Sequence, residues 1–205
     1  MKKFALCGLL FALCACGGTK VIDTTDAGQV ADMRDVMELE FRDWEKTAEN
    51  MTKSMIASGA LQRQKNPVIA VGRVTNDTMQ RFDTDILVKK IRTTLLSSGK
   101  AQVTTGFRNA SVAEDETTHN VRDTRGNAEY DASTIAEQGT LVAPNMSLTG
   151  KMIQRNLKVD TCWLCASKER VEYYLQMTLS DVRTGLSVWE DEQPIIKEGK
   201  RAPTW

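Results

Sequence analysis

Cys16 is the residue whose surroundings predict the most definite chemistry. It follows Leu13, Cys14 and Ala15, at the end of an apolar stretch that begins with Phe4 after two lysines. A basic start, a short apolar segment and small residues at a cleavage point form a bacterial secretory signal. A cysteine directly after the cut, preceded by this Leu and Ala, is the lipobox pattern. We therefore expect cleavage before Cys16, attachment of diacylglycerol to its thiol, and acylation of the new amino terminus.

Two further features concern where the mature chain resides. Gly17 and Gly18 follow the lipidated cysteine, in place of the Asp that commonly retains such proteins at the inner membrane. After the signal, no apolar run is long enough for a transmembrane helix. We therefore expect the outer membrane, with the protein lipid-anchored and facing the periplasm. The alternative is ordinary secretion, with the Cys16 thiol free or in a disulfide.

Cys162 and Cys165 are the other cysteines of the mature chain and enclose Trp163 and Leu164. An even pair in an oxidising compartment can form a local disulfide. A thioredoxin-type enzyme needs its first cysteine at a helix N-terminus, where the thiol pKa falls. Here the pair lies between two predicted strands, which favours a structural disulfide or two reduced thiols over catalysis. A zinc site would need a second pair of cysteines.

The rest of the sequence has no residues spaced as a catalytic or metal centre. His119 is the single histidine and lies in a polar segment, which favours a solvated side chain. There is no phosphate-binding glycine loop and no Gly-x-Ser-x-Gly motif. Asp83 and Asp85 stand at a predicted helix start, where capping and the helix dipole account for them. The sequence thus predicts no enzyme, no cofactor and no small-molecule substrate.

Composition indicates one folded domain. Without Lys2 and Lys3 of the signal, the mature chain has 25 basic and 27 acidic residues, a formal net charge of −2. This balance gives no basis for binding nucleic acid. A chain of this length can bury a proper core. We expect a signal peptide over 1–15, the lipidated Cys16 with a short flexible linker over 16–29, and a single globular domain over 30–200.

The predicted domain begins with a helix and a buried strand. A stripe of apolar residues at helical spacing predicts one long helix over 30–58, ended by Gly59. We favour packing of this stripe on the domain's own sheet over a partner-binding helix, because an uncovered stripe of this size is unfavourable. The continuous apolar run 68–74 suits a central strand covered on both faces. The stripe comprises Met33, Met37, Phe41, Trp44, Ala48, Met51 and Met55.

The remaining elements alternate and then end in strands. Asp83 or Thr84 can cap a helix to about residue 98, and a short strand follows over 101–105. We expect a polar surface excursion over 106–130 and a short helix through Gln138. Strands are predicted over 146–159, 169–182 and 186–196, followed by a frayed basic tail. The apolar side of the second helix comprises Ile86, Leu87, Ile91 and Leu95.

Several of these segments resemble the LpoB family, outer-membrane lipoproteins that activate penicillin-binding proteins. The most specific block joins the strand of 67–76 to Phe82-Asp83-Thr84-Asp85 and the Ser-Gly-Lys turn of 95–100. An Asp-x-x-Thr-Gly turn after the strand from Tyr173, followed by 188–190, adds to it. The resemblance covers most of residues 30–200 and implies an α/β (α+β) fold. That fold is a small mixed or antiparallel sheet flanked by helices, like the N-terminal domain of TolB.

The resemblance also implies a function. The protein would bind an accessory domain of a bifunctional (class A) penicillin-binding protein and stimulate its glycosyl-transfer and crosslinking activities. Two features depart from the family pattern: the Cys162-x-x-Cys165 insertion and the short linker over 17–29. Fully extended, that linker reaches about 45 Å, whereas family members carry a long proline-rich tether.

Two other functions remain as alternatives. One is a structural or assembly lipoprotein of another envelope machine, of the secretion or flagellar type, built on the same small fold. The other is a periplasmic thiol oxidoreductase that uses Cys162 and Cys165, which requires a helix N-terminus at Cys162. Recovery of the binding partner from native envelopes would discriminate among the three.

Overall fold

The chain divides into two compact units, Met1–Asp35 and Val36–Trp205. The computed structural model describes all residues except 1–21, 23–24, 32–35, 108–114, 160–167 and 201–205. In the first unit it describes one short helix, α1 (Ala27–Ala31), at the boundary between the predicted linker and domain. The Asp26 carboxylate begins this helix by accepting a hydrogen bond from the backbone N–H of Gly28 at 2.8 Å.

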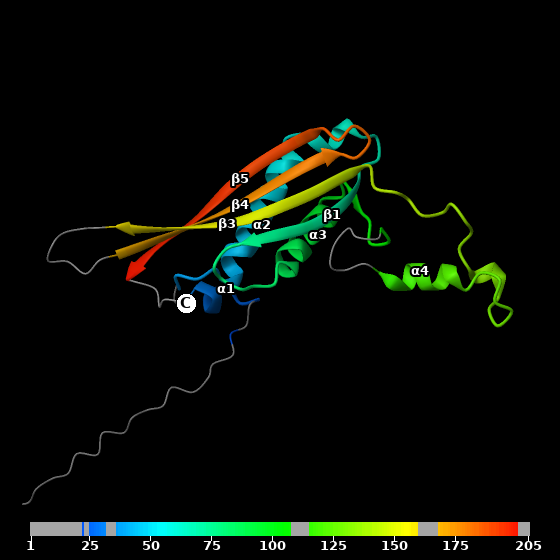
Figure 1. The fold of residues 1–205 in the computed structure, drawn as a ribbon, viewed down its shortest axis with the longest axis horizontal. Coiled ribbons are helices and arrows are strands. Elements are labelled where there is room, and N and C mark those ends of the chain that lie inside the picture. The colour runs from blue at the N-terminus through cyan, green and yellow to red at the C-terminus, as the bar shows by residue number, and fades with distance from the viewer. Residues whose placement is uncertain (1–21, 23–24, 32–35, 108–114, 160–167, 201–205) are drawn as a thin grey trace, which may run out of the picture. The chain divides into compact units, whose positions relative to one another are not determined.

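The second unit is an α+β domain, which confirms the predicted fold class. A five-stranded sheet in the described residues carries α2 and α3 on one face (Figure 1). The bounds of its elements are α2 (Phe41–Ala57), η1 (Ala60–Arg63), β1 (Val68–Asp77), α3 (Asp85–Ser98), β2 (Gln102–Val103), α4 (Glu116–Asp123), η2 (Ala132–Thr134), β3 (Met146–Val159), β4 (Lys168–Asp181) and β5 (Ser187–Lys200).

The sheet is mixed, in the order β2-β1-β3-β4-β5. Strand β1 runs parallel to both β2 and β3, whereas β3, β4 and β5 are antiparallel neighbours. Ile69 of β1 is paired with Val103 on one side and with Met146 on the other. The first four residues of β1 are buried, as expected for a central strand covered on both faces.

The core lies between the sheet and the two long helices. Helix α2 packs against α3 and β5, and α3 packs against β1 and β2. Trp44, Ala48, Met51 and Met55 of the predicted stripe are buried, and the ring of Trp44 meets Phe82 edge to face, with the ring centroids 4.0 Å apart. The interpretation that the stripe packs on the domain's own sheet is therefore confirmed.

The predicted helix over 30–58 was wrong in its first part. Residues 36–40 are not helical and bend at Met37 and Glu38, and α2 begins only at Phe41. The backbone of Leu39 explains this, because its N–H donates to the Gln80 side chain at 2.8 Å and its carbonyl accepts from the same amide at 3.0 Å. These groups are thereby lost to a helix. The Glu40 N–H donates to Asp43 at 3.0 Å, which places the helix start after it.

Three smaller predictions were also wrong. Ile86 is 61% exposed, and Val88 takes its place on the buried side of α3. Strand β5 continues to Lys200, so the tail predicted from Lys197 onward is paired with β4 up to that residue. The short helix predicted through Gln138 is only the single turn η2. That turn is stabilised by Asp131, whose carboxylate accepts from the Ser133 N–H at 2.9 Å.

Candidate functional site

The three cysteines singled out by the sequence lie outside the described residues. Cys16, Cys162 and Cys165 therefore remain predictions, for lipidation and for a disulfide or two reduced thiols. The two later cysteines fall between the ends of β3 and β4 in the chain. His119 is described and half-buried, and its Nε2 lies 2.9 Å from the Gly106 carbonyl oxygen. This histidine is therefore engaged in a local structural contact.

The paired carboxylates Asp83 and Asp85 lie at the start of α3, as predicted. Asp83 accepts a hydrogen bond from the Asp85 N–H at 2.9 Å, and Thr84 is the residue before the helix. Burial raises the pKa of Asp85 above its ordinary value, and the neighbouring Asp83 charge raises it further. The residues described contain no group of three or more His, Cys, Asp or Glu side chains that could hold a metal ion.

The motifs behind the family resemblance are structural in this fold. The Asp181 carboxylate accepts from the Thr184 N–H at 2.9 Å and from the Gln64 side chain at 2.7 Å. The hydrogen bond from Thr184 is the main reason that the pKa of Asp181 lies below its ordinary value. Gly99 ends α3 with φ 63°, a conformation that glycine adopts without strain. These residues specify turns and helix ends. They therefore identify the fold, but they do not indicate which surface binds a partner.

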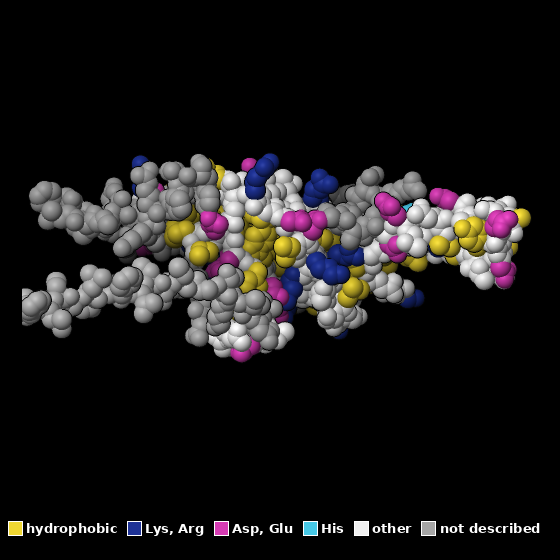
Figure 2. All heavy atoms as spheres, turned by 90° about the horizontal axis from the view of Figure 1, so that it is seen from below, with side chains coloured by type: hydrophobic (Ala, Val, Ile, Leu, Met, Phe, Trp, Pro, Cys, Tyr) yellow, Lys and Arg dark blue, Asp and Glu magenta, His cyan; other side chains and the backbone are white. Residues whose placement is uncertain are grey.

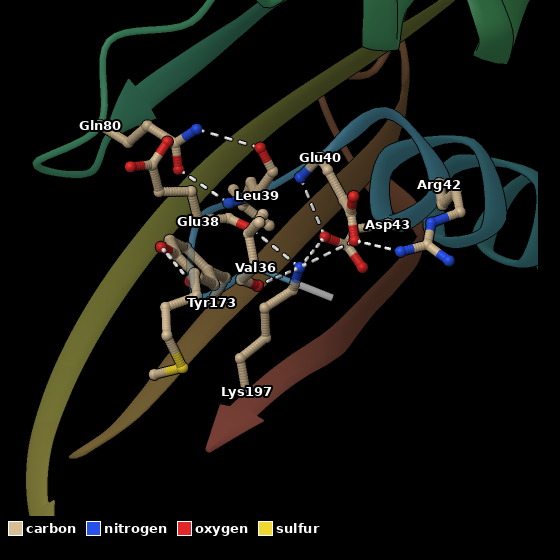
Figure 3. A network of polar contacts seen from close by, with 10 residues as sticks. Val36, Glu38, Leu39, Glu40, Arg42, Asp43, Gln80, Tyr173 and Lys197 are labelled. Carbon is tan, nitrogen blue, oxygen red and sulfur yellow. Dashed lines mark hydrogen bonds and ion pairs between the residues drawn. The ribbon is translucent and has the colours of Figure 1, made fainter. Parts of the chain in front are cut away.

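A non-helical segment, residues 36–40, leads into α2 and is fixed to the sheet by Lys197. We call it the strap (Figure 3). The Lys197 ammonium group donates to the carbonyl oxygens of Val36 at 3.0 Å and Glu38 at 2.8 Å. It also forms an ion pair with Asp43 at 2.5 Å and lies 3.6 Å from Glu40. The Lys197 side chain is only 11% exposed, so these contacts are sheltered from solvent.

Tyr173 of β4 fixes the strap at a second point. Its hydroxyl donates to the Met37 carbonyl oxygen at 3.3 Å. Burial raises the pKa of Tyr173 to about 12, and the carboxylates of Glu38 and Asp43 contribute to the increase. Sequence reasoning missed the strap because it depends on side chains far apart in the chain. The sequence signal that could have indicated the strap is Lys197, a lysine at an inward-facing position of β5.

The outer face of the sheet, opposite α2 and α3, is a first candidate interaction surface. No helix in the described part of the chain packs on it (Figure 1). Strand register aligns Ile153, Tyr174 and Pro194 in one row across β3, β4 and β5. One adjoining row, formed by Lys151, Gln176 and Glu192, is polar, and in it Gln176 donates to Glu192 at 2.6 Å. The other row holds Arg155 and Glu172 but ends in Ile196, which is 58% exposed. Exposed apolar side chains next to polar ones are suited to contact with another macromolecule.

The connection from β2 to β3 provides a second candidate surface. We call its described residues 115–143 the arm; it contains α4 and η2. None of the arm's side chains is buried, and α4 has no extensive contact with any other element. Figure 2 shows hydrophobic and acidic side chains interspersed at the outer end of the arm. Among the described residues, no helix is both long and apolar enough to cross a membrane.

A small α+β domain with an outer sheet face that no described helix covers and with an exposed arm has the organisation of a binding module. The chain belongs to the peptidoglycan-synthase activator LpoB family, whose model matches residues 43–195. The predicted family is thereby confirmed. No curated protein sequence matches the chain.

Several solved structures are similar to this chain. The C-terminal domain of LpoB from Escherichia coli is 15% identical, with 75% of this chain and 98% of that chain covered and a TM-score of 0.43. The corresponding domain from Salmonella enterica is 18% identical, with the same coverage and TM-score. The NMR structure of E. coli LpoB is 14% identical, with 94% of this chain and 88% of that chain covered and a TM-score of 0.40.

Proposed function

We propose that this protein is a lipid-anchored, non-enzymatic activator of a bifunctional penicillin-binding protein. The observation that carries the proposal is the match to the peptidoglycan-synthase activator family over residues 43–195. Those residues include most of α2, most of β5 and every element between them. The proposal extends the family description to one class of synthase, which makes both glycan strands and peptide crosslinks.

Activation by a binding protein requires differential affinity. A ligand shifts a conformational equilibrium only by as much as it prefers one state over the other. The activator must therefore bind the synthase more tightly in its active arrangement than in its resting one. A preference of about 1.4 kcal/mol changes that equilibrium roughly tenfold. A rigid domain surface can supply such a preference because it accommodates one arrangement of the partner better than another.

The lipid anchor would determine where activation takes place. Lipidation of Cys16 would hold the domain at the outer membrane, facing the periplasm, while the synthase approaches from the other side. Residues 16–35 lie between the anchor and the strap and span at most about 70 Å when fully extended. The helix α1 shortens that reach. With this partner, either the synthase extends outward to meet the domain or the periplasm is thin.

The decisive experiment is a synthase assay with purified components. A detergent-solubilised class A penicillin-binding protein from the source organism is incubated with lipid II, with and without the full-length protein. We expect faster glycan polymerisation and more crosslinked product at saturating activator. The protein alone should form no glycan and no crosslinks.

A binding measurement under the same conditions separates the remaining outcomes. Binding without stimulation would replace activation with a scaffolding role. Absence of binding, together with recovery of a different envelope complex from native membranes, would contradict the proposed function. The family membership would stand in either case.

A further inference from the structure

The connection between β2 and β3 is far longer than the fold requires. Val103 of β2 and Met146 of β3 are both paired with Ile69 of β1, so the connection starts and ends at the same level of the sheet. The gap is two strand spacings, about 10 Å. Because both strands run parallel to β1, the connection must cross over β1, for which about a dozen residues suffice, yet the chain uses residues 104–145. Long connections within a domain usually serve a function.

The arm contributes little to the core but is itself organised. Its side chains are all partly or fully exposed, and the large apolar ones include Tyr130 at 55% and Val142 at 64%. Exposed apolar side chains gathered on one element indicate a contact surface. Capping side chains fix its two short helical turns, since Asp115 accepts from the Thr117 N–H at 3.1 Å and Asp131 caps η2.

The two arginines of the arm form hydrogen bonds within it, whereas its carboxylates outnumber them and give it a negative charge. Arg125 donates to the carbonyl oxygens of Ala136 and Glu137, and Arg122 to Thr118 and Thr140. Both guanidinium groups thus hold the arm's two halves together. Six carboxylates against two arginines leave the arm with a formal charge of −4. The acidic residues are Asp115, Glu116, Asp123, Glu129, Asp131 and Glu137.

A hollow of about 450 Å³ lies at the end of the arm, between the residues after α4 and those around η2. Tyr130 and Ile135 provide apolar walls, and Glu137 lies at the same hollow. Glu129 adjoins Tyr130 in the chain, and neither glutamate forms an ion pair with a residue that the structure describes. Arg125 also lines the hollow, where its guanidinium group is engaged with the carbonyl oxygens of Ala136 and Glu137. The hollow therefore has an apolar floor and, despite Arg125, lies in an arm whose formal charge is −4.

We propose that the arm is a docking element that binds a basic segment of the partner synthase. The segment would insert an apolar side chain into the hollow lined by Tyr130 and Ile135, while neighbouring Lys or Arg side chains pair with Glu129 and Glu137. The identity of the partner rests on the proposed function. The apolar contact provides affinity, and the charges select and orient the partner.

Charge also argues against other occupants of the arm. The headgroups of anionic lipids and the phosphates of nucleic acids would be repelled by a segment of charge −4. Two arms from two copies of this chain would repel each other for the same reason. A basic protein surface is the occupant that complements both the charge and the hollow.

Excision of the arm provides the first test. In the full-length protein, residues 106–143 are replaced by about twelve Gly and Ser residues, the length that a crossover between two parallel strands needs. Thr104 and Asn145 are kept because their N–H groups donate to Ile69 and Val68 of β1. We expect an unchanged unfolding temperature to within a few degrees and roughly tenfold or weaker binding to the solubilised class A synthase.

Point variants within the intact arm provide the second test. Tyr130→Ser and the double change Glu129→Lys with Glu137→Lys should each weaken synthase binding by about tenfold. The charge change should also abolish much of the salt dependence of binding. Matched controls on the helices are Leu96→Ser, at a side chain 55% exposed, and Glu45→Lys, at one 52% exposed. Both controls should bind as tightly as the native chain.

Three outcomes decide the proposal. Tight binding by the intact protein and weak binding by both kinds of arm variant would support it. Equal binding by the intact and arm-excised proteins would overturn the docking role while the proposed function stands. Failure of the intact protein to bind the synthase would overturn the proposed function and, with it, the assignment of the arm's partner. Sedimentation of intact and excised proteins adds a check, since dimers lost on excision would replace the synthase with a second copy.

Discussion

Lys197 has an unusual number of partners for one lysine. Its ammonium group contacts two strap carbonyls and the Asp43 carboxylate. The side chains of Lys197, Asp43 and the nearby Glu40 are all largely buried. Hydrogen bonds to charged groups contribute more than neutral ones, because the full charge strengthens the attraction between donor and acceptor. This side chain therefore fixes where the chain enters the domain, next to the segment that leads toward the membrane anchor proposed here.

Replacing Lys197 with Met tests this role. The substitution keeps the apolar stem but leaves Asp43 without its cation, while Glu40 retains its ion pair with Arg42 at 2.6 Å. We expect a loss of about 2 kcal/mol in the free energy of unfolding, measured with urea. The control is Lys151→Met, because Lys151 pairs with Asp77 at the exposed outer face. An exposed pair contributes at most about 0.5 kcal/mol. Equal losses in the two variants would contradict a special role for Lys197.

Tyr173 predicts a pH dependence of stability. Its pKa is raised to about 12 in the fold, against about 10 in an unfolded chain, so the fold favours the neutral phenol. The contribution is complete below pH 10 and is lost as the pH rises from 10 to 12, because the unfolded chain ionises first. The full loss, two pKa units, corresponds to about 3 kcal/mol.

The measurement compares the native chain with Tyr173→Phe by urea unfolding at pH 9 and pH 11.5. At pH 9 the native chain should be more stable, by the net contribution of the hydrogen bond from Tyr173 to Met37. At pH 11.5 that advantage should disappear or reverse. All other ionisable groups are shared by the two proteins, so a constant difference across this range would contradict the assignment.

At the scale of elements, α2 provides the main cover of the sheet. Met51 and Met55 are completely buried between this helix and the strands. The expectation is that Met51→Ala lowers the free energy of unfolding by about 3 kcal/mol, through lost burial and a residual cavity. Met79→Ala is the matched control, since Met79 is 62% exposed in the loop after β1. Thermal and urea unfolding should agree, and a loss below 1 kcal/mol at Met51 would mean that α2 is loosely packed.

Local pattern was sufficient to predict some elements and insufficient for others. The four-residue spacing from Trp44 to Ala48 predicts the buried face of α2, and the period of two in β4 predicts its inward side chains. Gly99 and Gly185 both have positive φ, as their turn motifs predict. Such signals lie within a few residues of the feature that they specify.

The strap and the arm could not be predicted in the same way. The sequence Met33 to Met37 continues the helical spacing, but the Gln80 side chain, 41 positions away from Leu39, takes the backbone groups that a helix would use. The end of β5 is likewise set by pairing with β4 and by Lys197. For the arm, the sequence predicts a polar excursion, but the inward use of both arginines emerges only from the folded arrangement.

At the scale of the whole molecule, the proposal depends on a lipid at Cys16. The predicted chain then has an anchor, a short connecting segment and one folded domain that begins at the strap. An anchored protein searches for its partner near the membrane surface, where a short connection keeps its effective concentration high. The lipid therefore affects how often the domain meets its partner, and leaves the intrinsic affinity of the domain unchanged.

Metabolic labelling with an alkyne fatty acid tests this organisation directly. The native protein should carry the label, and Cys16→Ser should lose it, because no other residue can accept diacylglycerol at the lipobox. Cys14→Ser is the matched control, since Cys14 lies in the segment removed before Cys16 and its loss should leave labelling intact.

A second experiment tests whether the anchor is needed. A protein whose residues 1–16 are replaced by an ordinary secretory signal should be soluble in the periplasm. It should stimulate the purified synthase as well as the native protein does, yet fail to replace it in cells. Label retained in Cys16→Ser would contradict the anchor, and full function of the soluble form in cells would contradict the need for it.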